Sequence, residues 1–176
     1  MPVCVAVLVG PADLRVRKGS GLLTCVGLRT GACLCLYDPI THVAGMAHVT
    51  HSDLEELSPT RPGKYVASSL EGLTVAMERA GAVRSRLRAA IVGGAEVSVH
   101  SADNRDEALV VESGICRALE LELMRMGLNI YGAEIGGSAD RSVVLEAASG
   151  NVRIRAAGED RILCNLRYFA SHAAAA

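Results

Sequence analysis

Thiols and imidazoles gather in one part of the sequence, between Cys25 and His51. This stretch holds three of the six cysteines and three of the five histidines. A thiolate beside an imidazole can act as a nucleophile, provided that a third group orients the ring. His48 is the best candidate for the base, because it interrupts an apolar strand pattern, where an imidazole must find a partner or destabilise the fold. A cysteine hydrolase is therefore one interpretation of this stretch.

Two other interpretations stay open. Thiolates and imidazoles also bind zinc, and Cys33 and Cys35 would face the same side of a strand. The candidate ligands are Cys33, Cys35, His42, His48 and His51. Their spacing matches no familiar zinc motif, so we expect no tightly bound zinc and no other cofactor. Alternatively, the two thiols are small core residues, and His42 and His51 lie at loop edges.

The composition limits the class of protein. The chain has 176 residues, is 50% hydrophobic and has a net charge of -1, which is typical of one globular domain; we assign it to residues 1–166, followed by a tail at 167–176. The 18 basic and 19 acidic residues provide no overall field for nucleic acid. The apolar opening Val3–Val9 is too short to cross a bilayer and lacks the basic start of a signal peptide. We expect a cytoplasmic protein with reduced cysteines and no membrane insertion.

The elements that must position these residues follow from the apolar patterns. Short β-rich segments dominate the first third of the chain, and two helical patterns follow later with further strands around them. This order predicts an α+β fold rather than an alternating, doubly wound sheet. The expected helices are Tyr65–Ala80 and Ile115–Met126. The expected strands are Val3–Val9, Leu14–Lys18, Leu22–Leu28, Ala32–Tyr37, His42–Val49, Ala89–Val99, Asn129–Ile135, Ser142–Ala147 and Val152–Ala156.

Several short motifs, taken in order, resemble the CheD family of chemoreceptor glutamine deamidases. They are Tyr37-Asp38-Pro39, Gly45-Met46-Ala47-His48, Lys64-Tyr65, Gly93-Gly94-Ala95, Gly136-Gly137 and Gly150-Asn151-Val152. The resemblance implies packed mixed β-sheets with flanking helices, a CheD-like cysteine-hydrolase fold. It also implies a Cys–His–Thr site that deamidates glutamine and hydrolyses methyl esters on the cytoplasmic helices of chemoreceptors. A CheC-type phosphatase is a further partner that the resemblance suggests.

The resemblance also assigns residues to the site. Counted without gaps from Asp38, His48 falls on the family's histidine, Gly31 on its nucleophilic cysteine and Cys25 on its threonine. A second alignment makes Cys25 the nucleophile, but it needs a deletion before Cys25 and an insertion after it, so we prefer the ungapped one. Two other site motifs are altered at Glu112–Ile115 and Ser138–Asp140. Altered site motifs beside unaltered motifs elsewhere are the pattern expected when a protein retains the family's fold but has a changed site.

Two functions from different classes follow. In the first, the chain is a deamidase in which Cys25, activated by His48, replaces the missing nucleophile. In the second, it is a pseudoenzyme, a receptor-binding or adaptor domain without catalysis. A Cys/His metal-binding protein is the third alternative. A Cys25 thiol within hydrogen-bond reach of His48 would favour the first function.

Overall fold

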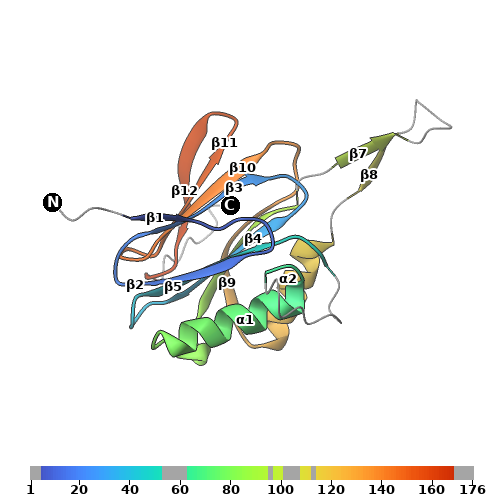
Figure 1. Cartoon of the computed structure of the whole chain (residues 1–176). Coiled ribbons are helices and arrows are strands. Elements are labelled where there is room, and N and C mark those ends of the chain that lie inside the picture. Colours follow the sequence, from blue (N-terminus) through green and yellow to red (C-terminus); the bar gives the residue numbers. More distant parts are fainter. Residues whose placement is uncertain (1–4, 53–62, 95–96, 101–107, 112–113, 169–176) are drawn as a thin grey trace, which may run out of the picture.

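In the part of the chain that the structure describes, two five-stranded β-sheets are stacked, and two α-helices pack on the outside of one of them (Figure 1). The computed structural model describes residues 5–52, 63–94, 97–100, 108–111 and 114–168. A sheet pairs its strands by hydrogen bonds and leaves two faces to cover, so a sheet buried on both faces needs a layer on each side. The second sheet meets this condition here, with the first sheet on one face and the helices on the other.

The first sheet has the strand order β1-β3-β10-β11-β12. β1 and β3 run parallel, and every other neighbouring pair is antiparallel. The strands are β1 (Ala6–Leu8), β3 (Leu22–Leu28), β10 (Arg141–Glu146), β11 (Asn151–Ala156) and β12 (Glu159–Asn165).

The second sheet has the order β2-β5-β4-β6-β9, with β6 and β9 parallel and the other pairs antiparallel. The strands are β2 (Leu14–Lys18), β5 (Val43–Val49), β4 (Ala32–Asp38), β6 (Arg88–Gly93) and β9 (Asn129–Ile135). The helices are α1 (Val66–Arg79), the short 3-10 helix η1 (Arg84–Arg86) and α2 (Ile115–Arg125). A hairpin of β7 (Val97–His100) and β8 (Ala108–Val111) reaches away from the body (Figure 1).

The core has two parts, one on each face of the second sheet. Alternate residues of β4 show the division: Leu34 and Leu36 belong to the cluster under the helices. Cys33, Cys35 and Tyr37 belong to the cluster between the two sheets. Successive side chains on a strand point to opposite faces, and both faces of this central strand are covered, so all of β4 is buried.

The α+β fold with packed mixed sheets is confirmed, and the predicted helices match α1 and α2. Three strand predictions need correction. His42 lies in the turn before β5 with a φ of 52°, so the strand begins at Val43. The segment Ala89–Val99 is interrupted after Gly93, because Gly93 and Gly94 have positive φ angles. Val3–Val9 contains only the short β1, and Val3 lies outside the described residues.

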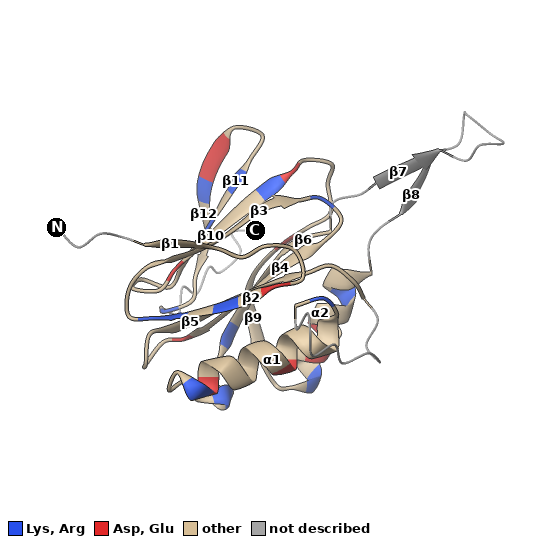
Figure 2. Cartoon of the chain, viewed as in Figure 1, with Lys and Arg blue, Asp and Glu red and all other residues tan. Residues whose placement is uncertain are grey.

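Basic and acidic residues are interspersed along the helices and the β11–β12 hairpin, with no large field of one sign in this view (Figure 2). No helix in the described part of the chain is long and apolar enough to cross a membrane.

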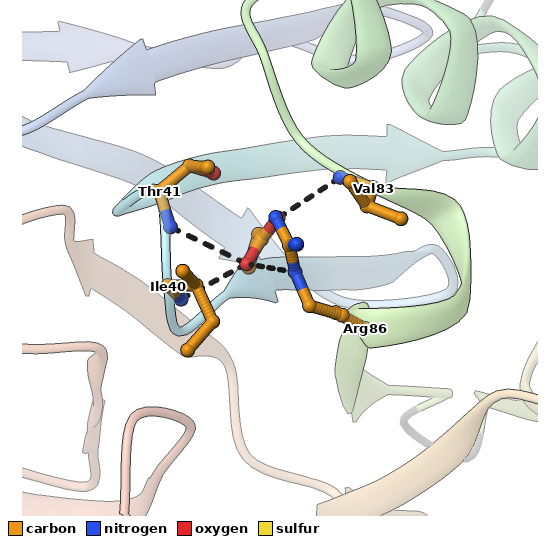
Figure 3. A network of polar contacts seen from close by, with 5 residues as sticks. Ile40, Thr41, Val83 and Arg86 are labelled. Atoms are coloured by element: carbon orange, nitrogen blue, oxygen red, sulfur yellow. Dashed lines mark hydrogen bonds and ion pairs between the residues drawn. The ribbon is translucent and has the colours of Figure 1, made fainter.

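A buried carboxylate, Asp38, ties the β4–β5 turn to the segment after α1 (Figure 3). Its oxygens accept hydrogen bonds from the backbone N–H groups of Ile40 (2.9 Å) and Val83 (2.9 Å). The Arg86 guanidinium donates to the same carboxylate at 2.6 Å. Burial raises the pKa of Asp38, but the Arg86 and backbone hydrogen bonds outweigh burial, and the pKa lies well below its usual range.

Candidate functional site

His48 lies at the end of β5 that is opposite to the Asp38 turn. It pairs with Cys33 of β4, and it shares its side of the strand with Ala44 and Met46, which face the first sheet. The backbone of His48 is fixed by two hydrogen bonds across to the β1–β2 connection, through Ala12 and Asp13. The imidazole is 5% exposed, and its Nδ1 has no hydrogen-bond partner among the described residues. This ring nitrogen is therefore not committed to a structural hydrogen bond within the described residues.

Gly31, just before β4, is in contact with this imidazole. A Cβ atom built on Gly31 would lie 3.1 Å from His48 Nε2 and 2.9 Å from the carbonyl oxygen of Val49. Gly93 borders Gly31 on the other side, because a Cβ atom at Gly93 would clash with the Gly31 carbonyl oxygen. The backbone of β6 therefore approaches the segment before β4 closely at Gly93. Any side chain placed at position 31 would begin next to the histidine ring.

Cys25 lies in the middle of β3, fully buried, with its thiol in the cluster between the sheets. A hydrogen bond with the Cys33 thiol, together with hydrogen bonding to His48 and its charge, lowers the pKa of Cys25 to about 6 despite burial, which raises it. The thiolate, which is the reactive form of cysteine, is thus favoured near neutral pH. The structure brings Cys25 and His48 together, but it gives the thiol no exposed surface.

Cys33 and Cys35 are also fully buried, as the core interpretation expects, with their sulfur atoms 3.9 Å apart. Hydrogen bonds with Cys25 and Cys35, together with burial, raise the pKa of Cys33 well above its usual value. Cys33 therefore keeps its proton.

The remaining candidate zinc ligands lie apart. His42 bonds through Nδ1 to the Tyr37 hydroxyl (3.0 Å) in the β4–β5 turn, at the opposite end of β5 from His48. His51 is exposed and hydrogen-bonds to Thr50, and its ring lies tilted against that of Tyr65. No group of three or more His, Cys, Asp or Glu side chains within the described residues is placed to hold a metal ion.

Sequence reasoning missed an ion-pair network beside the site. Arg141 is largely buried and donates to Glu134 (3.0 Å) and to the carbonyl oxygen of Gly136. The Gly136 N–H in turn donates to Gly93 (3.1 Å), and Arg29, in the loop before Gly31, pairs with Asp140 at 2.8 Å. Nothing in the sequence marked Glu134 as the partner of Arg141. Of the altered motif at Glu112–Ile115, residues 112 and 113 lie outside the described residues.

Comparison with known proteins supports the resemblance found in the sequence. A family model described as CheD chemotactic sensory transduction matches residues 50–156. A probable chemoreceptor glutamine deamidase CheD of Desulfitobacterium hafniense is 31% identical over 147 residues, which cover 84% of this chain and 91% of the relative. The protein of the same name from Pyrococcus horikoshii is 30% identical over 159 residues, 89% of this chain and 96% of the relative. The family match begins after the segment that carries Cys25, Gly31 and His48.

Proposed function

Because the chain belongs to the CheD family, we propose that it acts on chemoreceptors and deamidates their glutamines only weakly. The curated relatives are named as probable chemoreceptor glutamine deamidases. In this proposal His48 is the base of the family site, Gly31 stands at the nucleophile position, and the surface that recognises the receptor's cytoplasmic helices is kept. A CheC-type phosphatase is a second proposed partner, on family grounds alone.

The contact between Gly31 and His48 is the observation that carries the proposal. A Cβ on Gly31 would lie 3.1 Å from His48 Nε2, so a cysteine at this position would have its sulfur within reach of the base. This placement supports the ungapped alignment, in which Gly31 replaces the family's cysteine. Glycine has no side chain, so no thioester can form at position 31.

The expected family reaction identifies the step that is lost. The thiolate attacks the carboxamide carbon of glutamine, ammonia leaves with a proton from the imidazolium, and water then releases glutamate from the thioester. His48 can serve the proton transfers, but it offers no sulfur for the covalent intermediate. Without the thiol, only slower attack by water remains.

Cys25 as a relocated nucleophile is the second candidate. The lowered pKa of Cys25 and its interaction with His48 support this role. Against it, the thiol is fully buried between the sheets, so a receptor glutamine would have to enter the core to reach it. A displacement of about 1 Å from the productive geometry already reduces rates on the order of a hundredfold. We therefore propose that the family's nucleophile is absent at position 31 and that Cys25 does not replace it.

Gain of function at position 31 tests the proposal. Purified wild type, Gly31→Cys and Gly31→Ala are incubated with receptor fragments, and mass spectrometry follows the conversion of glutamine into glutamate. We expect little conversion by the wild type and by Gly31→Ala, and an increase of on the order of tenfold or more in Gly31→Cys. Gly31→Ala is the matched control, because it adds the same Cβ near Val49 without a thiol.

Two outcomes would contradict the proposal. Robust conversion by the wild type that disappears in Cys25→Ala and persists in Gly31→Ala would identify Cys25 as the nucleophile. Absence of receptor-fragment binding by folded wild type, measured by calorimetry, would remove the receptor as a partner. The Val49 carbonyl must shift slightly to admit any Cβ, so thermal unfolding of all three proteins is measured in parallel.

A further inference from the structure

The end of β6 holds the backbone of Gly31 against His48. The Gly94 N–H donates to the Gly31 carbonyl oxygen at 3.0 Å. Gly93 and Gly94 have φ angles of 142° and 66°, a backbone conformation that glycine adopts without strain. The place of these two residues therefore decides where Gly31 lies relative to the His48 ring.

The loop after β9 holds Gly93 in turn. The Gly136 N–H donates to the Gly93 carbonyl oxygen at 3.1 Å, and the Gly136 carbonyl oxygen accepts a hydrogen bond from Arg141 Nη2. Gly136 thus directs one backbone group toward the site and the other toward Arg141. A series of backbone hydrogen bonds and one close contact connects Arg141 with His48.

Glu134 fixes the guanidinium of Arg141. Arg141 Nε donates to the Glu134 carboxylate at 3.0 Å, and the two side chains are only 8% and 20% exposed. Glu134 belongs to β9 of the second sheet and Arg141 to β10 of the first, so this ion pair joins the two sheets. The planar fork of a guanidinium can donate to Glu134 and to Gly136 at the same time, which a single ammonium cannot match.

We propose that Arg141 is a positioning residue of the candidate site: its hydrogen bond to the Gly136 carbonyl holds the end of β6, and through it Gly31, against the His48 imidazole. The proposal deepens the proposed function and rests on its assignment of the site to Gly31 and His48. Arg141 acts through the backbone of the glycines and not on the substrate.

Thiol reactivity at position 31 tests the positioning without deamidation. Iodoacetamide reacts with the thiolate, so the pH profile of alkylation in Gly31→Cys reports whether the new sulfur lies beside the imidazolium. We expect the midpoint of this profile to lie at least about one pH unit lower in Gly31→Cys than in Gly31→Cys/His48→Leu. Fragment-ion mass spectrometry assigns the label to position 31 rather than to Cys33 or Cys35, which are fully buried.

Replacement of Arg141 should remove this difference. Arg141→Met and Arg141→Lys, each combined with Gly31→Cys, should raise the midpoint to near that of the His48→Leu variant. Lysine keeps the positive charge but not the fork, so its failure to rescue separates positioning from charge. Arg29→Met is the matched control and should leave the midpoint unchanged, because Arg29 precedes Gly31 closely but forms an exposed pair with Asp140.

Hydrogen exchange tests the same contacts in a chain that keeps Gly31 and Arg141, and it decides the matter if the double variants do not fold. Glu134→Gln weakens the ion pair that fixes Arg141. The amides of Gly94 and Gly136 should then exchange on the order of tenfold faster than in the wild type. The amide of Leu73, in the middle of α1, should keep its rate.

The outcomes separate the positioning from the proposed function. A midpoint that stays low in folded Arg141→Met and Arg141→Lys would overturn the positioning, and so would unchanged exchange of both glycine amides in Glu134→Gln. A midpoint that His48→Leu leaves unchanged would overturn both proposals, because Gly31 and His48 would then not form one site. A low midpoint that depends on Arg141, in a Gly31→Cys protein that converts no receptor glutamine, would confirm the positioning and reject the deamidation.

Discussion

Each end of the β4–β5 pair buries one ionisable group, Asp38 at one end and His48 at the other, and the surroundings of the two groups differ. At the turn end, the Asp38 carboxylate accepts hydrogen bonds from Arg86 and from backbone N–H groups, and it has no exposed surface. At the other end, His48 is nearly as buried, but Nδ1 has no partner in the described chain, and Nε2 borders a glycine.

This difference indicates that Asp38 has a structural role and that His48 is available for chemistry. Burial of a charge is tolerated when hydrogen bonds replace the lost water, as they do around Asp38. The Nδ1 atom of His48 has no such bond among the described residues, so we expect His48 to contribute less to stability than Asp38 does. Substitutions at the two ends should therefore separate stability from chemistry.

The largest effect is expected at the turn end. Asp38→Ala leaves Arg86 and the Val83 N–H without their acceptor, and we expect a loss of about 3 kcal/mol in the free energy of unfolding measured with urea. Asp140→Ala is the matched control, because Asp140 forms an exposed pair with Arg29. The control should lose less than about 0.5 kcal/mol. Equal losses in the two variants would remove the distinction drawn for Asp38.

The same pair predicts a pH dependence. The folded-state pKa of Asp38 lies below its value in the unfolded chain, so the unfolded state binds the proton more tightly. The stabilisation is present above the unfolded pKa, about 4, and is lost as the pH falls toward the folded value. Asp38→Asn should therefore show a shallower loss of stability in acid than the wild type.

The sequence could not predict the partners of Asp38. Asp38-Pro39 is a local turn signal, whereas Val83 and Arg86 reach the carboxylate only after the chain has passed through α1. β12 was missed because it is a polar edge strand with no alternating pattern to detect. The family resemblance placed Gly31 and His48 in one site. The contact between Cys25 and Cys33 crosses two sheets, and sheet pairing is not readable from short apolar segments.

A smaller effect on stability is expected at the site end. His48→Leu removes a buried Nδ1 that has no partner among the described residues, together with the interaction of the ring with Cys25, and it keeps an apolar side chain between the sheets. The free energy of unfolding should therefore stay within about 1 kcal/mol of the wild type. In the Gly31→Cys background, the same substitution should abolish any gained deamidation, because it removes the base. A loss as large as that of Asp38→Ala would mean that His48 is a structural residue.

The smallest expected effect is the gain or loss of one proton at Cys25. Its titration tests whether the thiol at the His48 end of the sheet is reactive. Ultraviolet absorbance of the thiolate should titrate with a midpoint of about 6 in the wild type and lose that step in Cys25→Ala. Because the folded-state pKa is lowered from 9.0, the thiolate stabilises the fold at high pH, and this contribution is lost as the pH falls through about 6.

Cys33→Ala removes the largest cause of the lowered pKa and should move the midpoint upward. Cys33→Ser keeps a donor on the same side chain and should move it less. An unchanged midpoint in Cys33→Ala would assign the shift to His48 alone and weaken the pairing of the two thiols across the sheets.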